Sequence, residues 1–410
     1  MRMGCDPTRK GNYMQVGDSA VELNVLLAEP PSSAEMREAT ALDQFMVPGA
    51  GPVLFGAGRV GRRAQAALRE GGVEPVAFAD NNPALWGSEV AGTPVMPPAE
   101  AARLYGGSRT FFVTIWQPGH SHKATKGQLM SLGCTRIASF LPIFWRSPQH
   151  SMPHYAFDLP HRILRDAGAI RAAFALLFDE KSRRCFVDVM RLRLLADFDA
   201  LPDPSPNDQF FPTDLISLSE SEVFVDCGAY DGDTIEAFVS RARGHFRGIV
   251  AFEPDVYSFS RLAARARSIP GGEDRLRLVN AAVGSVHAVV RFEASGSPGS
   301  ALSEVGGHEV SQVPLDLVLG DSQATFLKMD IEGAEFDALM GARKTIECFR
   351  PTVAVCVYHR PADIWRIPLY LASLVPGYRF FLRAHGEDGL DTVLYAVPPK
   401  SELSGVVEDA

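Results

Sequence analysis

Acidic side chains and small residues follow three apolar runs in the second half of this sequence. The first run leads into Asp226-Cys227-Gly228-Ala229-Tyr230-Asp231-Gly232. The others lead into Phe252-Glu253-Pro254 and Lys328-Met329-Asp330-Ile331-Glu332-Gly333-Ala334-Glu335. Each apolar run is typical of a buried parallel strand, and parallel strands present their carboxyl ends at one edge of a sheet. The three motifs therefore predict one ligand site at that edge.

The loop after the first strand suits a nucleoside ligand that carries no phosphate. It lacks the complete Gly-x-Gly-x-x-Gly spacing that seats a pyrophosphate on a helix N-terminus, and Asp226, Asp231 and Asp233 would repel a phosphate. S-Adenosyl-L-methionine has an amino group, a sulfonium and a ribose, and Glu253 is placed to bind both ribose hydroxyls. For Asp226 alone, an ordinary strand-turn-helix explains the pattern equally well. The predicted cofactor contacts are Asp226, Gly228, Ala229, Tyr230, Asp231, Gly232, Glu253, Pro254, Asn280 and Ala281.

The order of predicted elements favours a methyltransferase sheet over a dinucleotide-dependent dehydrogenase. Strands are predicted near 223–227, 248–252, 276–281, 325–329 and 352–357. The last two strands, 378–383 and 392–397, are joined by a link too short for a crossover helix, so they form an antiparallel hairpin. The predicted fold is α/β, with a seven-stranded mixed sheet of the class I methyltransferase type.

Residues from about 161 to 398 resemble the FkbM-type methyltransferases. The resemblance lies in the three motifs above, together with Asn280-Ala281-Ala282-Val283-Gly284 and Tyr358-His359-Arg360-Pro361. It implies an S-adenosyl-L-methionine-dependent O-methyltransferase, acting on a hydroxyl of a sugar or of a polyketide-type natural product. It does not identify the acceptor.

The acceptor hydroxyl needs alignment with the methyl carbon and a base that takes its proton. His359 ends a predicted strand, and histidine titrates most readily near neutral pH. We predict His359 as the base and Asp330 as the residue that orients it or the hydroxyl, with Glu332 and Lys328 beside them. Helix-capping acids, a structural histidine and a buried ion pair at Lys328 are alternatives. A divalent-metal site formed by Asp330, Glu332 and His359 is a further, less favoured alternative.

An earlier segment carries a complete glycine motif. A predicted strand leads into Gly56-Ala57-Gly58-Arg59-Val60-Gly61, then a helix, then a second strand that ends at Asp80. Gly56, Gly58 and Gly61 permit a phosphate to approach, and Asp80 stands where a ribose would be met. The segment resembles the small Rossmann-like N-terminal domains that hold nucleotide-linked sugars, which implies such a ligand in a separately built site. A packing role, an NAD-dependent oxidoreductase and an inactive nucleotide-sugar-binding protein are the alternatives.

The predicted organisation has four parts. They are an arm over 1–48, the nucleotide-sugar-binding-like domain over 49–150, a helical connector over 151–212 and the methyltransferase domain over 213–400. Ala294–Val310 is rich in Gly and Ser and predicts an active-site loop. Phe210 and Phe211 are interpreted as interdomain packing, with a lid as the alternative.

Composition restricts the partners. A net charge of -9 offers no basic surface for nucleic acid, so a small-molecule or saccharide acceptor is expected. No apolar run reaches the roughly 20 residues of a membrane span, and the polar N-terminus predicts a cytoplasmic location. The six cysteines form no Cys-x-x-Cys pair, which argues against a zinc site, and Cys227 and Cys356 are predicted core residues. A homo-oligomer is compatible with the sequence.

Overall fold

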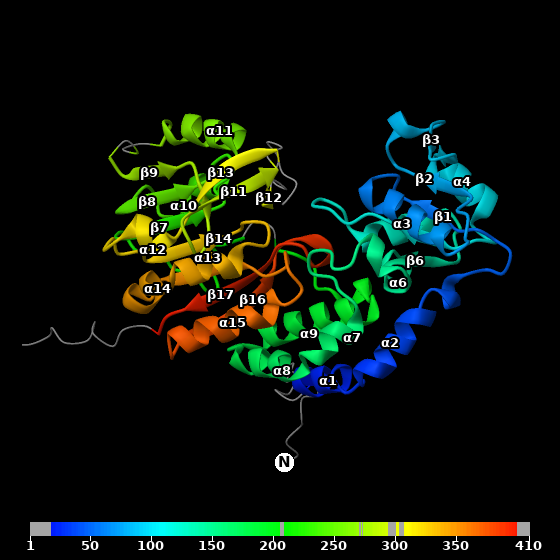
Figure 1. Ribbon diagram of the computed structural model, residues 1–410, viewed down its shortest axis with the longest axis horizontal. Coiled ribbons are helices and arrows are strands. Elements are labelled where there is room, and N and C mark those ends of the chain that lie inside the picture. The colour runs from blue at the N-terminus through cyan, green and yellow to red at the C-terminus, as the bar shows by residue number, and fades with distance from the viewer. Residues whose placement is uncertain are drawn as a thin grey trace, which may run out of the picture.

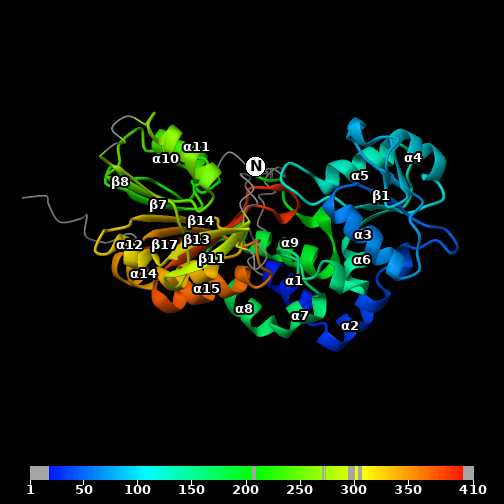
Figure 2. The same ribbon diagram turned by 45° about the horizontal axis from the view of Figure 1, so that its top comes forward.

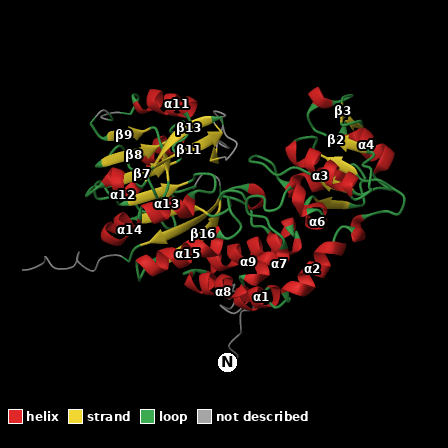
Figure 3. Ribbon diagram, in the orientation of Figure 1, coloured by secondary structure: helices red, strands yellow, loops and turns green. Residues whose placement is uncertain are grey.

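The computed structural model describes residues 18–205, 209–269, 272, 274–293, 301–302 and 307–399. It shows two α/β lobes that stand side by side above a layer of helices (Figures 1 and 2). Both lobes have strands at their centre and helices around them (Figure 3). This is the expected α/β architecture with parallel-dominated sheets.

The lobe formed by the later part of the chain contains a seven-stranded mixed sheet with the order β16-β17-β15-β14-β7-β8-β9. Its strands are β7 (Val223–Cys227), β8 (Gly248–Phe252), β9 (Leu276–Val279), β14 (Phe326–Met329), β15 (Thr352–Cys356), β16 (Arg379–Ala384) and β17 (Thr392–Val397). β7, β8, β9, β14 and β15 run parallel to one another, whereas β17 is antiparallel to both β15 and β16. The predicted sheet and its terminal hairpin are therefore confirmed.

Helices cover this sheet because its strands are apolar on both faces, as expected for parallel strands. They are α10 (Asp233–Arg241), α11 (Val256–Ala266), α12 (Leu315–Leu319), α13 (Glu335–Gly341), α14 (Arg343–Phe349) and α15 (Asp363–Leu374). Cys227 and Cys356 are fully buried in the strands, which confirms them as core residues. Phe211 packs against Phe224 and Phe326 on this core, and a buried Phe side chain contributes about 1.5–3 kcal/mol. Phe211 therefore packs on the core of this sheet itself, and its interpretation as interdomain packing stays a prediction.

An active-site loop was expected over Ala294–Val310, but the described residues of this segment belong mostly to strands. β10 (Ala282–Val283), β11 (Ala288–Glu293), β12 (Ala301–Leu302) and β13 (His308–Val313) form a separate four-stranded sheet with the order β10-β13-β11-β12. Residues 294–300 and 303–306 lie outside the described residues. An antiparallel sheet with one solvated face accepts polar residues, so the polar composition that indicated a loop is compatible with strands.

The lobe formed by the earlier part of the chain contains a six-stranded sheet with the order β3-β4-β2-β1-β5-β6. Its strands are β1 (Val53–Phe55), β2 (Ala77–Ala79), β3 (Glu89–Val90), β4 (Thr93–Met96), β5 (Phe111–Val113) and β6 (Ile137–Ser139), and all pairs except β3–β4 are parallel. The helices are α3 (Arg59–Glu70), α4 (Pro98–Tyr105), α5 (His122–Ser131) and α6 (Leu141–Arg146). The predicted strand, glycine turn and helix are present as β1, the turn at Gly56 and α3.

The layer beneath the lobes consists of α1 (Asp18–Leu26), α2 (Pro31–Thr40), α7 (Pro160–Arg165), α8 (Ala167–Leu176) and α9 (Glu180–Leu195), with α15 beside them (Figure 1). α1 and α2 were expected to belong to an arm, and this expectation is wrong for the described part of 1–48. Leu23 and Leu27 are buried in the same core as α8 and α9, and Glu38 accepts a hydrogen bond from the backbone N–H of His161 (2.6 Å). Val21 and Val25 of α1 are exposed while Leu23 is buried, so no apolar periodicity marks this helix in the sequence.

A buried carboxylate connects the two lobes. Asp388, in the link between β16 and β17, accepts hydrogen bonds from the backbone N–H of His122 (3.0 Å to each oxygen). The indole N–H of Trp116 donates to the Asp388 carbonyl (3.0 Å). The terminal hairpin thereby holds the earlier lobe against the edge of the seven-stranded sheet. Among the described residues, no helix is long and apolar enough to cross a membrane.

Candidate active site

A cavity of about 890 Å³ opens at the carboxyl edge of the seven-stranded sheet. Gly228, Tyr230, Glu253, Pro254, Ala281, Asp330 and Glu332 line it from the later lobe, and Arg59, Trp116, His154 and Tyr155 line it from the earlier part of the chain. Ligand cavities are typically about 300–1,000 Å³, so this volume leaves room for an acceptor beside a cofactor. Both halves of the protein therefore build one site.

Gly228 allows the loop after β7 to touch the end of β14. Its φ is 80°, and a Cβ atom there would lie 1.9 Å from the carbonyl oxygen of Asp330. Any side chain would push the two strand ends apart, so only glycine fits. Tyr230 follows with a φ of 47° and donates its backbone N–H to Oε2 of Glu253 (2.8 Å).

Glu253 lies at the end of β8 and is buried against this loop. Its two carboxylate oxygens accept hydrogen bonds from the backbone N–H groups of Tyr230 and Asp255, each at 2.8 Å. A carboxylate oxygen has two lone pairs, so each oxygen can accept one more donor from the cavity. Burial raises the pKa of Glu253 to about 7. Asn280 donates its side-chain N–H to the Glu253 carbonyl (2.8 Å) and so fixes this strand end.

Asp226 and Lys328 form a buried ion pair that supports the cavity wall. They stand opposite each other on β7 and β14, with 3.0 Å between Nζ and Oδ1, and Asp226 is completely buried. Lys328 also donates to the carbonyl of Gly228 (2.7 Å). Burial opposes the charge on Lys328, but Asp226 and Asp330 outweigh it and raise the Lys328 pKa. Lys328 therefore forms the buried ion pair that was the alternative to a catalytic role. Through Lys328, Asp226 supports the loop at Gly228.

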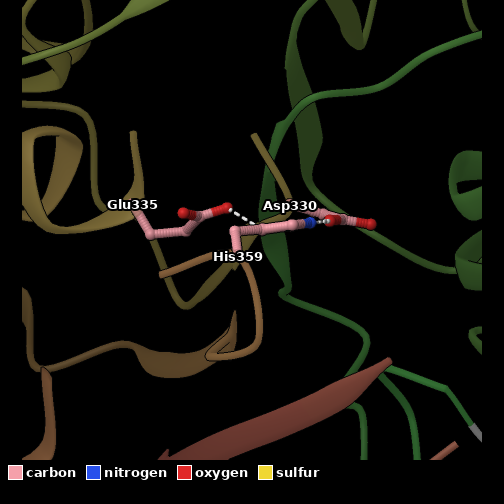
Figure 4. Close-up of side chains that lie close together, drawn as sticks. All are labelled: Asp330, Glu335 and His359. Atoms are coloured by element: carbon pink, nitrogen blue, oxygen red, sulfur yellow. Dashed lines mark hydrogen bonds and ion pairs between the residues drawn. The ribbon is translucent and has the colours of Figure 1, made fainter. Parts of the chain in front are cut away.

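His359 lies in a ring of carboxylates. Its Nδ1 is 2.7 Å from Oε1 of Glu335, and its Nε2 is 3.5 Å from Oδ1 of Asp330 and 3.9 Å from Oε2 of Glu332. Figure 4 shows the imidazole between Glu335 and Asp330. Arg193, buried on α9, donates to the carbonyl of Pro361 (2.9 Å) and holds the segment that carries His359.

This environment does not fit the predicted role of His359 as a base. Burial would lower the pKa of His359, but Glu335 first, and then Asp330 and Glu332, raise it to about 10. The neighbouring carboxylates thus favour the imidazolium form over the neutral imidazole that a base requires. His359 is also 4% exposed, behind the carboxylates that line the cavity. The sequence showed its position at a strand end but not its carboxylate neighbours.

Glu332 has the properties that were expected of His359. It is a non-glycine residue in left-handed conformation, with a φ of 54°, which turns its carboxylate toward His359 and the cavity. Burial raises its pKa to about 7, against the opposing effect of His359. A residue held in such a conformation costs about 1–3 kcal/mol and persists where the surroundings impose it.

Tyr155 was missed by the sequence analysis. It lines the cavity together with Arg59 and Glu332, and burial and the charge of Glu332 raise the pKa of its hydroxyl. Its ring lies beside those of Trp116 and His154, with centroids 5.2 and 5.1 Å away. No periodic pattern surrounds Tyr155, and the only signal was the density of aromatic residues between 140 and 157.

The glycine motif of the earlier lobe is largely explained by packing. A Cβ atom at Gly61 would lie 1.9 Å from the carbonyl oxygen of Gly56, whereas Gly58 has open space around it. The carboxylate of Asp80 accepts hydrogen bonds from the backbone N–H groups of Ala57 and Asn82, each at 2.8 Å, and closes the turn. Arg59, the first residue of α3, lines the shared cavity. A separate ligand site at Gly56, Gly58, Gly61 and Asp80 stays a prediction.

Of the predicted cofactor contacts, Gly228, Tyr230, Glu253, Pro254 and Ala281 line the cavity. Ala229 is buried behind them, and Asp231 forms an ion pair with Arg265 (3.1 Å). Gly232, with a φ of 93°, precedes α10. The structure thus brings the three motifs to one edge, as the sequence predicted. Some of their residues line the cavity, and the others hold the lining residues in place.

Comparisons with known proteins agree with this geometry. Residues 226–388 match the sequence model of the Methyltransferase FkbM domain. The fold is similar to the crystal structure of methyltransferase FkbM from Methylobacillus flagellatus KT, with a TM-score of 0.73 and 23% identity over 93% of this chain and 98% of that chain. A weaker match is fibrillarin, a pre-rRNA processing protein of Methanococcus jannaschii, with a TM-score of 0.30 and 11% identity over 47% of this chain and 76% of that chain. None of the curated proteins matches the sequence.

The family match spans β7 to the link before β17, and it includes the loop at Gly228, the Glu253 strand end and the carboxylate ring around His359. These are the features that the sheet brings together at its carboxyl edge. Residues 226–388 of this chain are therefore an FkbM methyltransferase domain.

Proposed function

We propose that the protein is an S-adenosyl-L-methionine-dependent O-methyltransferase whose acceptor is a hydroxyl of a saccharide. The observation that carries the proposal is Glu253, which is buried at the end of β8, lines the cavity and accepts one hydrogen bond at each carboxylate oxygen from the described residues. A carboxylate in this position of an open α/β sheet suits the two hydroxyls of a ribose. Asp330 and Glu332 add negative charge to the same cavity, which suits a sulfonium and disfavours a phosphate cofactor.

Methyl transfer is a direct displacement, in which the acceptor oxygen bonds to the methyl carbon as the carbon–sulfur bond breaks. The proton of the hydroxyl passes to a carboxylate of the pair Asp330 and Glu332, which line the cavity. The pKa of Glu332, near 7, is suited to this task at neutral pH. His359 sits behind the pair, with Nε2 3.5 Å from Asp330 and 3.9 Å from Glu332.

The earlier lobe supplies the acceptor side of the cavity. Trp116, His154 and Tyr155 form an aromatic wall, and aromatic faces pack well against the apolar face of a sugar ring. Arg59 at the start of α3 adds a positive charge that suits the phosphates of a nucleotide-linked sugar. These contacts support a saccharide acceptor, with the nucleotide-linked form as the favoured one.

We expect Glu253→Gln to weaken the binding of S-adenosylhomocysteine by about 10- to 100-fold, because a charge-assisted hydrogen bond contributes about 1.5–3 kcal/mol. Isothermal calorimetry measures this change. Glu347→Gln is the control, since Glu347 lies on α14 in a pair with Arg343 and away from the cavity. Equal affinity in wild type and Glu253→Gln would remove Glu253 from the cofactor site.

A further inference from the structure

The carboxylate ring around His359 has the composition of a metal site. Asp330, Glu335 and His359 each offer a ligand atom, and these atoms lie within 4.8 Å of one another. Glu332 adds a fourth side chain, 3.9 Å from Nε2 of His359. Acidic clusters are common on proteins without a bound ion, so the evidence for a metal site must come from the imidazole of His359.

The imidazole has one nitrogen without a hydrogen bond. Nε2 of His359 is buried and makes no hydrogen bond to any described residue. The 3.5 Å to Asp330 and 3.9 Å to Glu332 are too long for good hydrogen bonds. Two ligands bound at about 2.0–2.2 Å to one ion are roughly 3–4 Å apart. The distances from Nε2 of His359 to Asp330 and to Glu332 therefore fit pairs of ligands that share a cation better than they fit direct contacts.

The other nitrogen is already oriented. Nδ1 faces Oε1 of Glu335 at 2.7 Å, and the backbone N–H of Ile331 donates to the same oxygen (2.9 Å). Histidine ligands of metals typically donate their second N–H to a carboxylate, which fixes the tautomer and directs the free nitrogen to the ion. Glu335 is fully buried and holds the ring in this way.

The charge of the cluster also calls for a cation. Asp330, Glu332 and Glu335 place three carboxyl groups around one imidazole, and Glu332 has a left-handed φ of 54°. A divalent ion would replace the proton on Nε2 and balance the carboxylates. A site of one imidazole and carboxylates suits a first-row transition ion such as Mn²⁺.

We propose that Nε2 of His359, together with Asp330 and Glu332, binds a divalent transition ion, with Glu335 as the residue that orients the imidazole. The role of this ion rests on the proposed function. The ion would hold the acceptor hydroxyl and ease the loss of the hydroxyl proton to a free carboxylate oxygen. Binding of the ion itself does not require methyl transfer.

The test is the binding of Mn²⁺ alone to the full chain. The protein is first dialysed against chelator, and Mn²⁺ is then added while electron paramagnetic resonance measures the free ion. We expect one Mn²⁺ per chain in the wild type, no binding in His359→Ala, and about 10- to 100-fold weaker binding in Glu335→Gln. Asp330→Asn is the variant least prone to misfold, because Asp330 is partly exposed, and it should also lose Mn²⁺. Glu347→Gln should bind as the wild type does.

Absence of bound Mn²⁺ in the wild type, or equal binding in Asp330→Asn, would overturn the proposal. Calorimetry with S-adenosylhomocysteine in chelator separates this result from the proposed function. A chain that binds Mn²⁺ but no S-adenosylhomocysteine keeps the metal site and loses the methyltransferase assignment. A chain that binds S-adenosylhomocysteine but no Mn²⁺ keeps the function and loses the metal.

Discussion

Lys328→Met is expected to lower the free energy of unfolding by about 3–5 kcal/mol at pH 7, because it leaves the completely buried carboxylate of Asp226 without its partner. Urea denaturation followed by circular dichroism measures the loss. The double variant Lys328→Met with Asp226→Asn should recover much of it, since no buried charge remains.

The exposed pair Arg343 and Glu347 provides the matched control for this ion pair. Arg343→Met should cost less than about 1 kcal/mol, as exposed pairs do. If Lys328→Met were as mild as Arg343→Met, the carboxylate of Asp226 would not depend on Lys328, and our description of the cavity wall would be incorrect.

Asp330→Asn is expected to lower turnover by about 10²- to 10⁴-fold while the affinity for S-adenosylhomocysteine stays unchanged. Asp330 lies at the carboxyl end of β14 and lines the cavity. Among the described residues, its side chain makes no hydrogen bond to Glu253 or to the loop at Tyr230. Transfer of a labelled methyl group to a saccharide acceptor, found by screening, measures turnover.

Asp321→Asn is the control for this variant, because Asp321 is exposed before the amino end of β14. It should keep full turnover. Wild-type turnover in Asp330→Asn would remove Asp330 from the chemistry and leave Glu332 as the acceptor of the proton.

The sequence was sufficient to predict the sheet and the edge at which the site lies. Strands such as β7 and β15 are apolar runs that end in Asp, Gly or His, and this local pattern is independent of the rest of the chain. The hairpin of β16 and β17 followed from the length of its link. These features depend on short-range spacing, which one sequence displays directly.

The roles of individual site residues depend on contacts between distant segments, and these the sequence does not display. Asp226 and Lys328 are 102 positions apart, so their ion pair follows only from the register of β7 and β14. The pKa of His359 depends on three carboxylates, which the sequence does not place beside it, and its role as base stays a prediction that this environment disfavours. Tyr155 and Glu332 line one cavity only because the earlier lobe folds against the sheet edge.

A ligand screen by thermal unfolding tests the central assignment most directly. A ligand at about 100 times its dissociation constant stabilises by roughly 2.7 kcal/mol, which shifts the Tm of a domain this size by about 5–10 °C. We expect a shift of this size with S-adenosylhomocysteine and none with NAD or NADP. A shift with NAD or NADP and none with S-adenosylhomocysteine would contradict the account and assign the chain to an oxidoreductase built on the glycine motif at Gly56.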